Sequence, residues 1–379
     1  MKIGIVCPYN IYRPGGVQST VLAHQSELKK RGHTVKVIAP KPVKMPNNEI
    51  EDTILIGKSA ELNTPFHTLV DIAISTDTSI LDDLLSRENF DILHFHEPWV
   101  PILAIQLLSR SKTINVATFH GKLPENLINR YVEHAIKPYT KSVFSKLHYL
   151  TAVSNVPAQY AKEISKKPIE IIPNGIDLKL YNPKETGKIS KYDDKLKNIF
   201  YVGRLEKRKG VIYLLKAFKE LTKKHKDVRL IIAGDGKQRN TLEQYIKNNS
   251  LKNVEFLGFV DESEKLKLFN TCDIFCSPAI FGESFGIVLI EAMAFGKPVV
   301  AGNNQGYACV LSGRGSLGLV DPKNSVEFGR LLEMALFDEG VNQLLKDWSL
   351  SSVKQYNYPK IVDRYESIYK DLVRLNNKA

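Results

Sequence analysis

The sequence has little of what marks disulfide-rich, zinc-binding or membrane-spanning proteins. Its 379 residues include four scattered cysteines with no second pair of Cys or His ligands near them, so we expect reduced thiols and no zinc finger. No segment reaches the roughly 18 uninterrupted apolar residues of a membrane span. The apolar stretch at residues 3–6 is too short for a signal peptide and is typical of a strand. These absences predict a cytoplasmic protein that can meet the inner face of the plasma membrane only peripherally.

The charge is strongly positive but unevenly distributed. The formal net charge is +12, yet no recognition motif accompanies it, so nucleic acid is not expected as a partner. Residues 1–111 hold 11 Lys/Arg and 12 Asp/Glu, whereas residues 112–167 hold 9 and 3. The basic segment suits an anionic surface or substrate, or it is an ordinary lysine-rich exterior. Both interpretations remain open.

Both halves of the chain alternate short apolar strands with helices. The predicted strands are residues 2–6, 34–38, 91–95, 115–119, 199–202, 229–233, 254–257, 274–276 and 298–301, with helices over 17–31 and 210–223. A segment rich in Pro, Gly and Asn, residues 171–183, is typical of a linker. The pattern predicts an α/β chain with two Rossmann-like, doubly wound parallel sheets, in domains 1–175 and 176–357. Such sheets bind ligands beyond the carboxyl ends of their strands.

Two glycine-containing turns follow predicted strands and open predicted helices. At Gly15 and Gly16 the bare backbone can approach a phosphate, whose charge a helix N-terminus favours. The spacing is not Gly-x-Gly-x-x-Gly, so a nicotinamide cofactor is disfavoured. The turn at 203–210 offers Arg204 as a planar fork and Lys209 as a point charge. Such a pair can stabilise a departing nucleotide diphosphate without a metal ion; the alternative is an exposed basic turn.

The strongest signal is a pair of carboxylates eight positions apart, Glu283 and Glu291. They bracket a predicted helix start whose free amides, at residues 284–287, are expected to meet phosphate. Glu283 can accept hydrogen bonds from sugar hydroxyls, and Glu291 from ribose hydroxyls. An acid in an otherwise apolar helix needs such a partner. A helix cap with a surface acid is the simpler alternative.

Three histidines near strand ends are further candidates. His120 follows the strand at 115–119 and could hydrogen-bond a donor sugar or the reacting centre. His94 and His96 occupy alternating strand positions, which puts both imidazoles on one face. No third or fourth ligand is evident, so packing or cleft lining is favoured over a metal site.

A basic amphipathic helix is expected over residues 126–148. Its polar stripe comprises Arg130, His134, Lys137, Lys141 and His148. Such a helix can lie on anionic lipid, or it can be a surface helix packed on its own domain; neither is preferred.

In combination these residues resemble the retaining GT-B glycosyltransferases of family four over nearly the whole chain. The shared elements are Gly15–Gly16, residues 172–177, Gly203–Arg204 with Lys209–Gly210, residues 233–236 and 257–260, and the Glu283/Glu291 pair. Residues 94–98, 117–120 and 282–292 are similar to those of phosphatidylinositol mannosyltransferases. The resemblance implies that a last helix, residues 358–375, crosses back onto the first domain.

The resemblance also implies a reaction. The donor would be a nucleotide sugar, GDP-mannose, and the acceptor a membrane lipid such as phosphatidylinositol, with the anomeric configuration retained and no metal or other cofactor. The implied catalytic residues are His120, Arg204, Lys209 and Glu283. The implied donor site comprises Gly15, Gly16, Arg204, Lys209, Val260, Lys265, Glu283, Ser284, Phe285, Gly286, Ile287 and Glu291. The implied acceptor site comprises Tyr9, Gln18 and Lys122.

The acceptor half departs from the family pattern more than the donor half. The region before residues 94–98, basic in those mannosyltransferases, carries Asp71, Asp77, Asp82 and Asp83 here. Trp99 stands where a small amide is expected, and Lys122 comes early. The alternatives are therefore a UDP-sugar-dependent transferase acting on another lipid or a soluble glycan, an epimerase or phosphorylase of related fold, and a non-catalytic module that binds nucleotide sugar or membrane.

Overall fold

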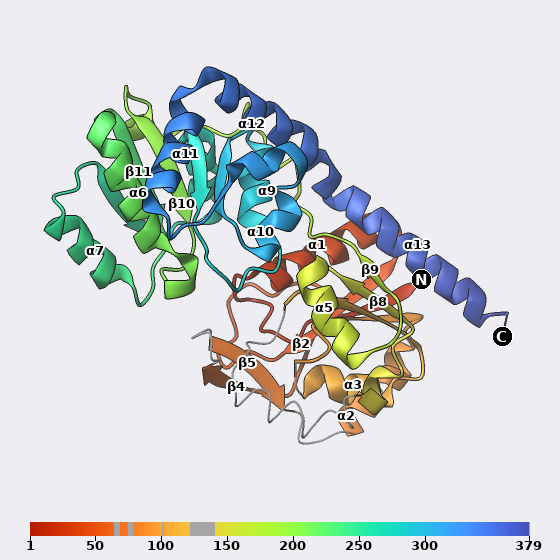
Figure 1. The fold of residues 1–379 in the computed structure, drawn as a ribbon. Coiled ribbons are helices and arrows are strands. Elements are labelled where there is room, and N and C mark those ends of the chain that lie inside the picture. The colour runs from red at the N-terminus through yellow and green to blue at the C-terminus, as the bar shows by residue number, and fades with distance from the viewer. Residues whose placement is uncertain (64–68, 75–78, 101, 122–140, 379) are drawn as a thin grey trace. The chain divides into compact units, whose positions relative to one another are not determined.

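The computed structural model describes residues 1–63, 69–74, 79–100, 102–121 and 141–378 (Figure 1). Its contacts divide the chain into two compact units, Met1–Gly175 with Tyr358–Ala379, and Ile176–Asn357. Each unit has a parallel sheet covered by helices, so the predicted α/β fold with two doubly wound sheets is confirmed. No helix in the described ranges is both long and apolar enough to cross a bilayer.

The first unit is built on seven parallel strands in the order β3-β2-β1-β6-β7-β8-β9. Their bounds are β1 Lys2–Val6, β2 Thr34–Pro40, β3 Thr53–Ile56, β6 Ile92–His96, β7 Ile114–Phe119, β8 Tyr149–Ala152 and β9 Ile169–Ile171. The order reverses between β1 and β6. At such a switch point the loops after the two strands turn to opposite faces and leave a crevice. The loops after β1 and β6 are thus the expected ligand edge of this unit.

Helices bury both faces of this sheet. On β1, Ile3 and Ile5 pack with residues of the helices α1 and α13, whereas Val6 packs with those of α2, α3 and α5 on the other face. The helix bounds are α1 Gly16–Lys30, α2 Ser79–Glu88, α3 Leu103–Arg110, α5 Asn155–Ile164 and α13 Tyr358–Asn376. The last helix, α13, lies beside α1 and buries Tyr365 and Tyr369 in the core of this unit (Figure 1). A small antiparallel hairpin, β4 (Lys58–Asn63) and β5 (Leu69–Ile74), completes it.

The second unit repeats this plan with six parallel strands in the order β12-β11-β10-β13-β14-β15. Their bounds are β10 Lys197–Val202, β11 Val228–Ala233, β12 Val254–Gly258, β13 Ile274–Ser277, β14 Val299–Gly302 and β15 Leu319–Val320. The helices are α6 Val211–Lys224, α7 Arg239–Asn248, α8 Glu262–Thr271, α9 Ile287–Ala294, α10 Gln305–Val310, α11 Ser325–Phe337 and α12 Glu339–Ser352. Here the order reverses between β10 and β13, so a ligand crevice is expected where the loops after β10 and β13 part.

Every predicted strand is present, with its ends at most two residues from the predicted ones. The predicted helix over 126–148 can be compared with the structure only from residue 141 onward. Residues 122–140, with Arg130, His134 and Lys137, lie outside the described residues. Residues 141–144 are helical, but the helix ends before His148, so the predicted end is wrong. The chain turns there because the Nδ1 atom of His148 accepts a hydrogen bond from the Asn115 amide at 2.9 Å, next to the start of β8.

Candidate functional site

Two glycines shape the basic turn after β10. Gly203 and Gly210 have φ angles of 155° and 69°, conformations that side chains disfavour. A Cβ atom on Gly210 would lie 2.1 Å from the carbonyl oxygen of Pro278, in the loop after β13. The 3₁₀ turn η2 (Lys207–Lys209) lies between the two glycines. The sequence of this turn therefore holds its cations against the loop on the other side of the switch point.

Three cations and two acids of this region form one ion-pair network. Glu283 Oε1 lies 2.7 Å from Arg208 Nη1 and 2.8 Å from Lys209 Nζ. Arg208 Nε is 2.9 Å from Glu206 Oε2, and the other oxygen of Glu206 is 2.7 Å from Arg204 Nη1. The network carries one excess positive charge. A phosphate or diphosphate group would meet that charge at the carboxyl edge of the sheet.

The sequence predicted three members of this network, and the structure brings Arg204, Lys209 and Glu283 together. Burial lowers the pKa of the Arg204 guanidinium, and nearby Glu206 opposes that shift. Arg208 was missed, although its contact with Glu283 is as short as any in the network. Three consecutive basic residues occupy η2. Only the direction of each side chain, which depends on the turn, separates Arg208 from its neighbours.

Helix α9 begins at a glycine that cannot be replaced freely. Gly286, its N-cap, has φ 103° and ψ 65°, and no side chain in the described part of the chain caps the helix. A Cβ atom on Gly286 would lie 2.7 Å from two ring carbons of Tyr307, whose hydroxyl is held 2.7 Å from Ser277 Oγ. The first amides of α9 are thus presented beside a fixed ring without a side-chain acceptor. Free amides at a helix start favour an anion, and their predicted contact with phosphate stays a prediction.

The residues next to Gly286 differ in burial. Ser284 and Ile287 are half-buried. Phe285 is buried, with its ring centroid 5.6 Å from that of Tyr356. Phe285 therefore anchors the loop to the core of its unit, and its backbone remains as its means of contact with a ligand.

Glu291 is a buried acid that uses one of its two carboxyl oxygens for hydrogen bonds within the described residues. Its Oε1 atom accepts hydrogen bonds from the Tyr181 hydroxyl and from Lys265 Nζ, both at 2.9 Å. Its buried Oε2 atom has no hydrogen-bond partner among the described residues. Burial opposes protonation of Lys265, but Glu291 and Glu262 raise its pKa, so the ammonium persists. The Oε2 atom of Glu291 can accept a hydrogen bond from a ribose hydroxyl. Val260, after β12, is half-buried.

In the first unit the glycine turn follows β1. Gly15, the N-cap of α1, has extended backbone, φ −178°, so its conformation does not demand glycine. The Gln18 side chain folds over it: a Cβ atom on Gly15 would lie 2.3 Å from Gln18 Oε1, and Gln18 Nε2 donates to Asn10 O at 3.4 Å. Gly16 opens α1, and Tyr9 is half-buried in the loop before it. The roles of these residues stay predictions, and Lys122 lies outside the described residues.

His120 is buried at the end of β7 and held on two sides. Its Nε2 atom is 2.7 Å from His96 Nδ1, and its backbone amide donates to Glu97 Oε1 at 2.6 Å. Burial lowers the pKa of His120 to about 3, so the imidazole is neutral at neutral pH. Glu97, which follows β6 directly, has φ 50° and is buried, which raises its pKa to about 8. A strained, buried acid that fixes the His120 loop is a feature of functional sites.

His94 and His96 are both buried on β6, with ring centroids 4.4 Å apart. The sequence offered no third ligand beside them, but the structure does. His24, buried on α1, has its ring centroid 6.3 Å from that of His94 and 5.6 Å from that of His96. No pattern in the sequence could have marked His24, because about seventy residues separate it from the other two.

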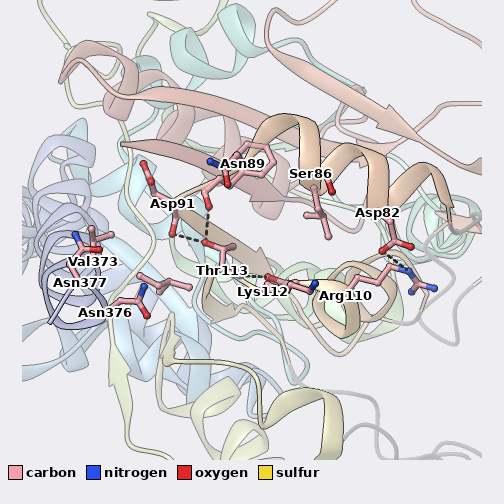
Figure 2. A pocket seen from close by; sticks show the side chains of 14 residues that line it. Asp82, Ser86, Asn89, Asp91, Arg110, Lys112, Thr113, Val373, Asn376 and Asn377 are labelled. Atoms are coloured by element: carbon pink, nitrogen blue, oxygen red, sulfur yellow. Dashed lines mark hydrogen bonds and ion pairs between the residues drawn. The ribbon is translucent and has the colours of Figure 1, made fainter. Parts of the chain in front are cut away.

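A cavity of about 550 Å³ in the first unit lies elsewhere (Figure 2). Asp91 and Thr113, which line it, directly precede β6 and β7, so it opens at the amino edge of the sheet. The Thr113 hydroxyl donates to the carbonyls of Phe90 and Asp91 at 2.7 and 2.9 Å. Doubly wound sheets bind their ligands at the opposite, carboxyl edge, so this cavity is not the candidate site.

The fold and the site define a class of protein. Two doubly wound units, one with a cationic turn, an uncapped helix start and paired acids, are the architecture of a GT-B glycosyltransferase. Residues 184–352 match the family described as glycosyl transferases group 1, and residues 14–180 match glycosyltransferase family 4.

Individual proteins are similar to this chain in sequence or in fold. A phosphatidyl-myo-inositol mannosyltransferase of Mycolicibacterium smegmatis is 32% identical over 316 residues, covering 82% of this chain and 78% of that protein. A glycosyltransferase from Rickettsia africae shares the fold with a TM-score of 0.79 and 21% identity, over 98% of both chains. A protein from Anabaena, solved in complex with UDP-glucose, has a TM-score of 0.72 at 18% identity, over 98% of this chain and 100% of that one.

The chain therefore belongs to the group 1/family 4 glycosyltransferases, the family that includes the phosphatidyl-myo-inositol mannosyltransferases. It is an enzyme, a hexosyltransferase, as the sequence predicted.

Proposed function

We propose that this enzyme transfers mannose from GDP-mannose to the inositol ring of phosphatidylinositol, with retention of configuration and without a metal ion. The acceptor is suggested by the 32% identical mannosyltransferase of Mycolicibacterium smegmatis. The donor end is supported by one observation above the others. A cationic network surrounds Glu283, which lies just before helix α9 at the switch point of the second unit. The same helix carries buried Glu291, whose Oε2 atom has no hydrogen-bond partner among the described residues.

Each group has a part in this proposal. Arg204, Arg208 and Lys209 meet the diphosphate, together with the first amides of α9. Glu283, freed in part from its cations when the diphosphate binds them, accepts hydrogen bonds from the mannose hydroxyls. Glu291 accepts a ribose hydroxyl through Oε2. The remaining residues of the implied donor site, including Val260 and Lys265, are proposed to contact the nucleotide sugar as well.

The chemical step balances within the substrates. The bond between the anomeric carbon and the diphosphate oxygen breaks, and a bond to the inositol oxygen forms on the same face of the sugar. The leaving phosphate takes the acceptor's proton. The cations stabilise the growing negative charge on the leaving group, which is the task that a divalent ion would otherwise perform. His120, neutral and hydrogen-bonded, contributes a hydrogen bond near the reacting centre.

The acceptor side rests on the first unit, with Tyr9, Gln18 and Lys122 as the proposed contacts. Contact with an anionic membrane, and a place on the inner face of the plasma membrane, are part of this proposal. Trp99 does not argue against it, because its half-buried indole packs against the core, with its ring centroid 5.9 Å from that of Tyr160. The unexpected tryptophan is thus a packing residue.

A donor and acceptor panel tests the proposal. The purified protein is incubated with GDP-, UDP- and ADP-sugars and vesicles that contain phosphatidylinositol or diacylglycerol, and the lipid product is analysed by mass spectrometry. We expect mannosyl-phosphatidylinositol from GDP-mannose, and no rise in rate when Mg²⁺ or Mn²⁺ is added. Glu283→Ala should abolish transfer, whereas Glu243→Ala, which removes an exposed acid of α7, should not. Turnover of UDP-sugars with GDP-mannose inert would overturn the donor assignment.

A second candidate is a UDP-sugar-dependent transferase with another lipid or a soluble acceptor. The observation that favours it is the acidic character of α2. The family resemblance implies a basic, lipid-facing surface in this region, but the side chain of Asp82 is 61% exposed there. Product formation from a soluble polyol acceptor in the absence of vesicles would select it. A chain that binds nucleotide sugar tightly but turns over no donor in the panel would instead be a binding module.

A further inference from the structure

Three histidines converge in the core of the first unit. His24 comes from α1, and His94 and His96 from β6, and all three are buried. Each offers a ring nitrogen, and these nitrogens lie within 4.8 Å of one another. Nitrogens bound to one tetrahedral zinc ion stand about 3.4 Å apart, since each Zn–N bond is about 2.0–2.1 Å. Small rotations of the rings would close that difference.

The hydrogen bonds of this cluster are incomplete. Within the described residues, neither ring nitrogen of His24 has a hydrogen-bond partner, and His96 Nε2 has none. A buried polar atom without a partner is rare and costs free energy, so three such atoms in one cluster need an explanation. Packing alone supplies none, because an apolar side chain would fill the same space without that cost.

Both ring nitrogens of His94 are hydrogen-bonded, and a metal ion would replace one of these bonds. His94 Nδ1 is 2.6 Å from the Tyr369 hydroxyl, and His94 Nε2 is 2.7 Å from Thr118 Oγ1. Thr118 Oγ1 also lies 2.6 Å from Thr151 Oγ1, so it keeps a partner if His94 Nε2 turns to a metal. A histidine ligand is commonly held in this way, through its other nitrogen, by a hydrogen-bonding group.

We propose that His24, His94 and His96 form a binding site for a divalent transition-metal ion of the Zn²⁺ type, with the fourth position taken by water. Neutral imidazoles select Zn²⁺, Co²⁺, Ni²⁺ or Cu²⁺ over Mg²⁺ and Ca²⁺, which prefer oxygen ligands. The charged groups of the proposed transfer reaction belong to the second unit, so the site meets that proposal only through His120. The role of the site is to bind the metal and, through it, to join β6 to α1.

The metal would also set the state of His120. With His96 Nε2 on the metal, His96 Nδ1 carries a proton and donates to His120 Nε2, 2.7 Å away. The other ring nitrogen of His120 then carries the proton and is a hydrogen-bond donor, as the proposed transfer requires. Buried Glu97 accepts the His120 amide and so fixes the backbone beside this histidine.

The test uses the untagged full-length chain, stripped with EDTA and dialysed against Co²⁺ or Zn²⁺, with Mg²⁺ as the comparison. We expect one transition-metal ion per chain by elemental analysis. Co²⁺ should give the visible absorption of a tetrahedral site without a thiolate charge-transfer band, which excludes cysteine ligands. His24→Gln should weaken binding by about 100-fold or more. His225→Gln, which removes a histidine paired with Glu333 in the second unit, should leave binding unchanged.

Two outcomes overturn the proposal. If the wild type takes up no stoichiometric Co²⁺ or Zn²⁺, the cluster is a metal-free polar core, and this result does not depend on the folding of any variant. If folded His24→Gln, checked by circular dichroism, binds Co²⁺ with the wild-type spectrum and affinity, the ion lies elsewhere. Neither result bears on the donor and acceptor panel, so the two proposals fail separately.

Discussion

At the scale of single residues, Arg204 is the most exposed cation of the network in the second unit. Its side chain is 46% exposed, against 13% for Arg208 and 16% for Lys209, and Glu206 holds it at 2.7 Å. Arg208 and Lys209 are committed to Glu283 before any ligand arrives. An incoming diphosphate therefore has its easiest access to Arg204.

We predict that Arg204→Ala weakens binding of GDP by about 10- to 100-fold, because a hydrogen bond to a charged group contributes about 1.5–3 kcal/mol. Isothermal titration calorimetry measures this directly. The matched control is Arg239→Ala, which removes an arginine paired with Glu243 on α7 of the same unit. Equal affinities for Arg204→Ala and the wild type would remove Arg204 from the donor site.

A second residue, Glu88, makes stability depend on pH. Its Oε2 atom lies 3.0 Å from Lys2 Nζ and 2.8 Å from Lys36 Nζ, on β1 and β2. The hydrogen bond from Lys36 lowers the pKa of Glu88 from 4.5 to about 2. The unfolded chain then binds a proton more readily than the folded one. The stabilisation is present above about pH 4.5 and is lost as the pH falls toward 2.

We therefore expect Glu88→Gln to lower the free energy of unfolding by on the order of 2 kcal/mol at pH 6, and by much less near pH 3. Urea unfolding at the two pH values, followed by circular dichroism, gives both differences. A gap between wild type and variant that stayed constant from pH 6 to pH 3 would mean that the two lysines do not hold this carboxylate in the folded state.

At the scale of elements, the start of α9 depends on one backbone conformation. Gly286 has φ 103° and faces the Tyr307 ring. We predict that Gly286→Ala costs about 1–2 kcal/mol from the backbone alone, and that it displaces the amides offered to the diphosphate. Urea unfolding and GDP titration measure the two effects.

Gly187→Ala serves as the control, because a Cβ atom added to Gly187 would meet no heavy atom within 4 Å and its φ angle is not positive. It should behave as the wild type in both measurements. If Gly286→Ala binds GDP normally, the N-terminus of α9 is not part of the donor site.

The sequence predicted the central strands of both sheets because those strands are buried on both faces and appear as short apolar runs. It did not predict β3, β8, β9 or β15. These strands are two to four residues long, and β15 comprises Leu319–Val320 alone. Strands this short carry no periodic signal, and hydrogen bonding to a neighbouring strand creates them. Because β8 was not recognised in the sequence, the helix predicted before it was extended too far, to His148.

At the scale of the whole molecule, the two units have separate cores and need not unfold together. A ligand stabilises the part of the chain that binds it, by about 2.7 kcal/mol at 100 times its dissociation constant. We predict that GDP alone slows amide exchange at residues 203–211 and 284–290 of the second unit. The strands β7 and β8 of the first unit should exchange as before. Hydrogen exchange with mass spectrometry checks both, and protection limited to the first unit would reverse the proposed assignment of the donor.

The sequence by itself determined the repeated β/α pattern, the glycines that end β10 and open α9, and the pair Glu283 and Glu291, because each depends on spacing over a few residues. Only the tertiary structure decided which side chains meet. Arg208 reaches Glu283 across 75 positions, and Tyr181 reaches Glu291 across 110. His24 joins His94 and His96 because α1 covers the face of β6 on which both histidines lie. Contacts of this kind follow from the order of strands in a sheet, which local spacing does not specify.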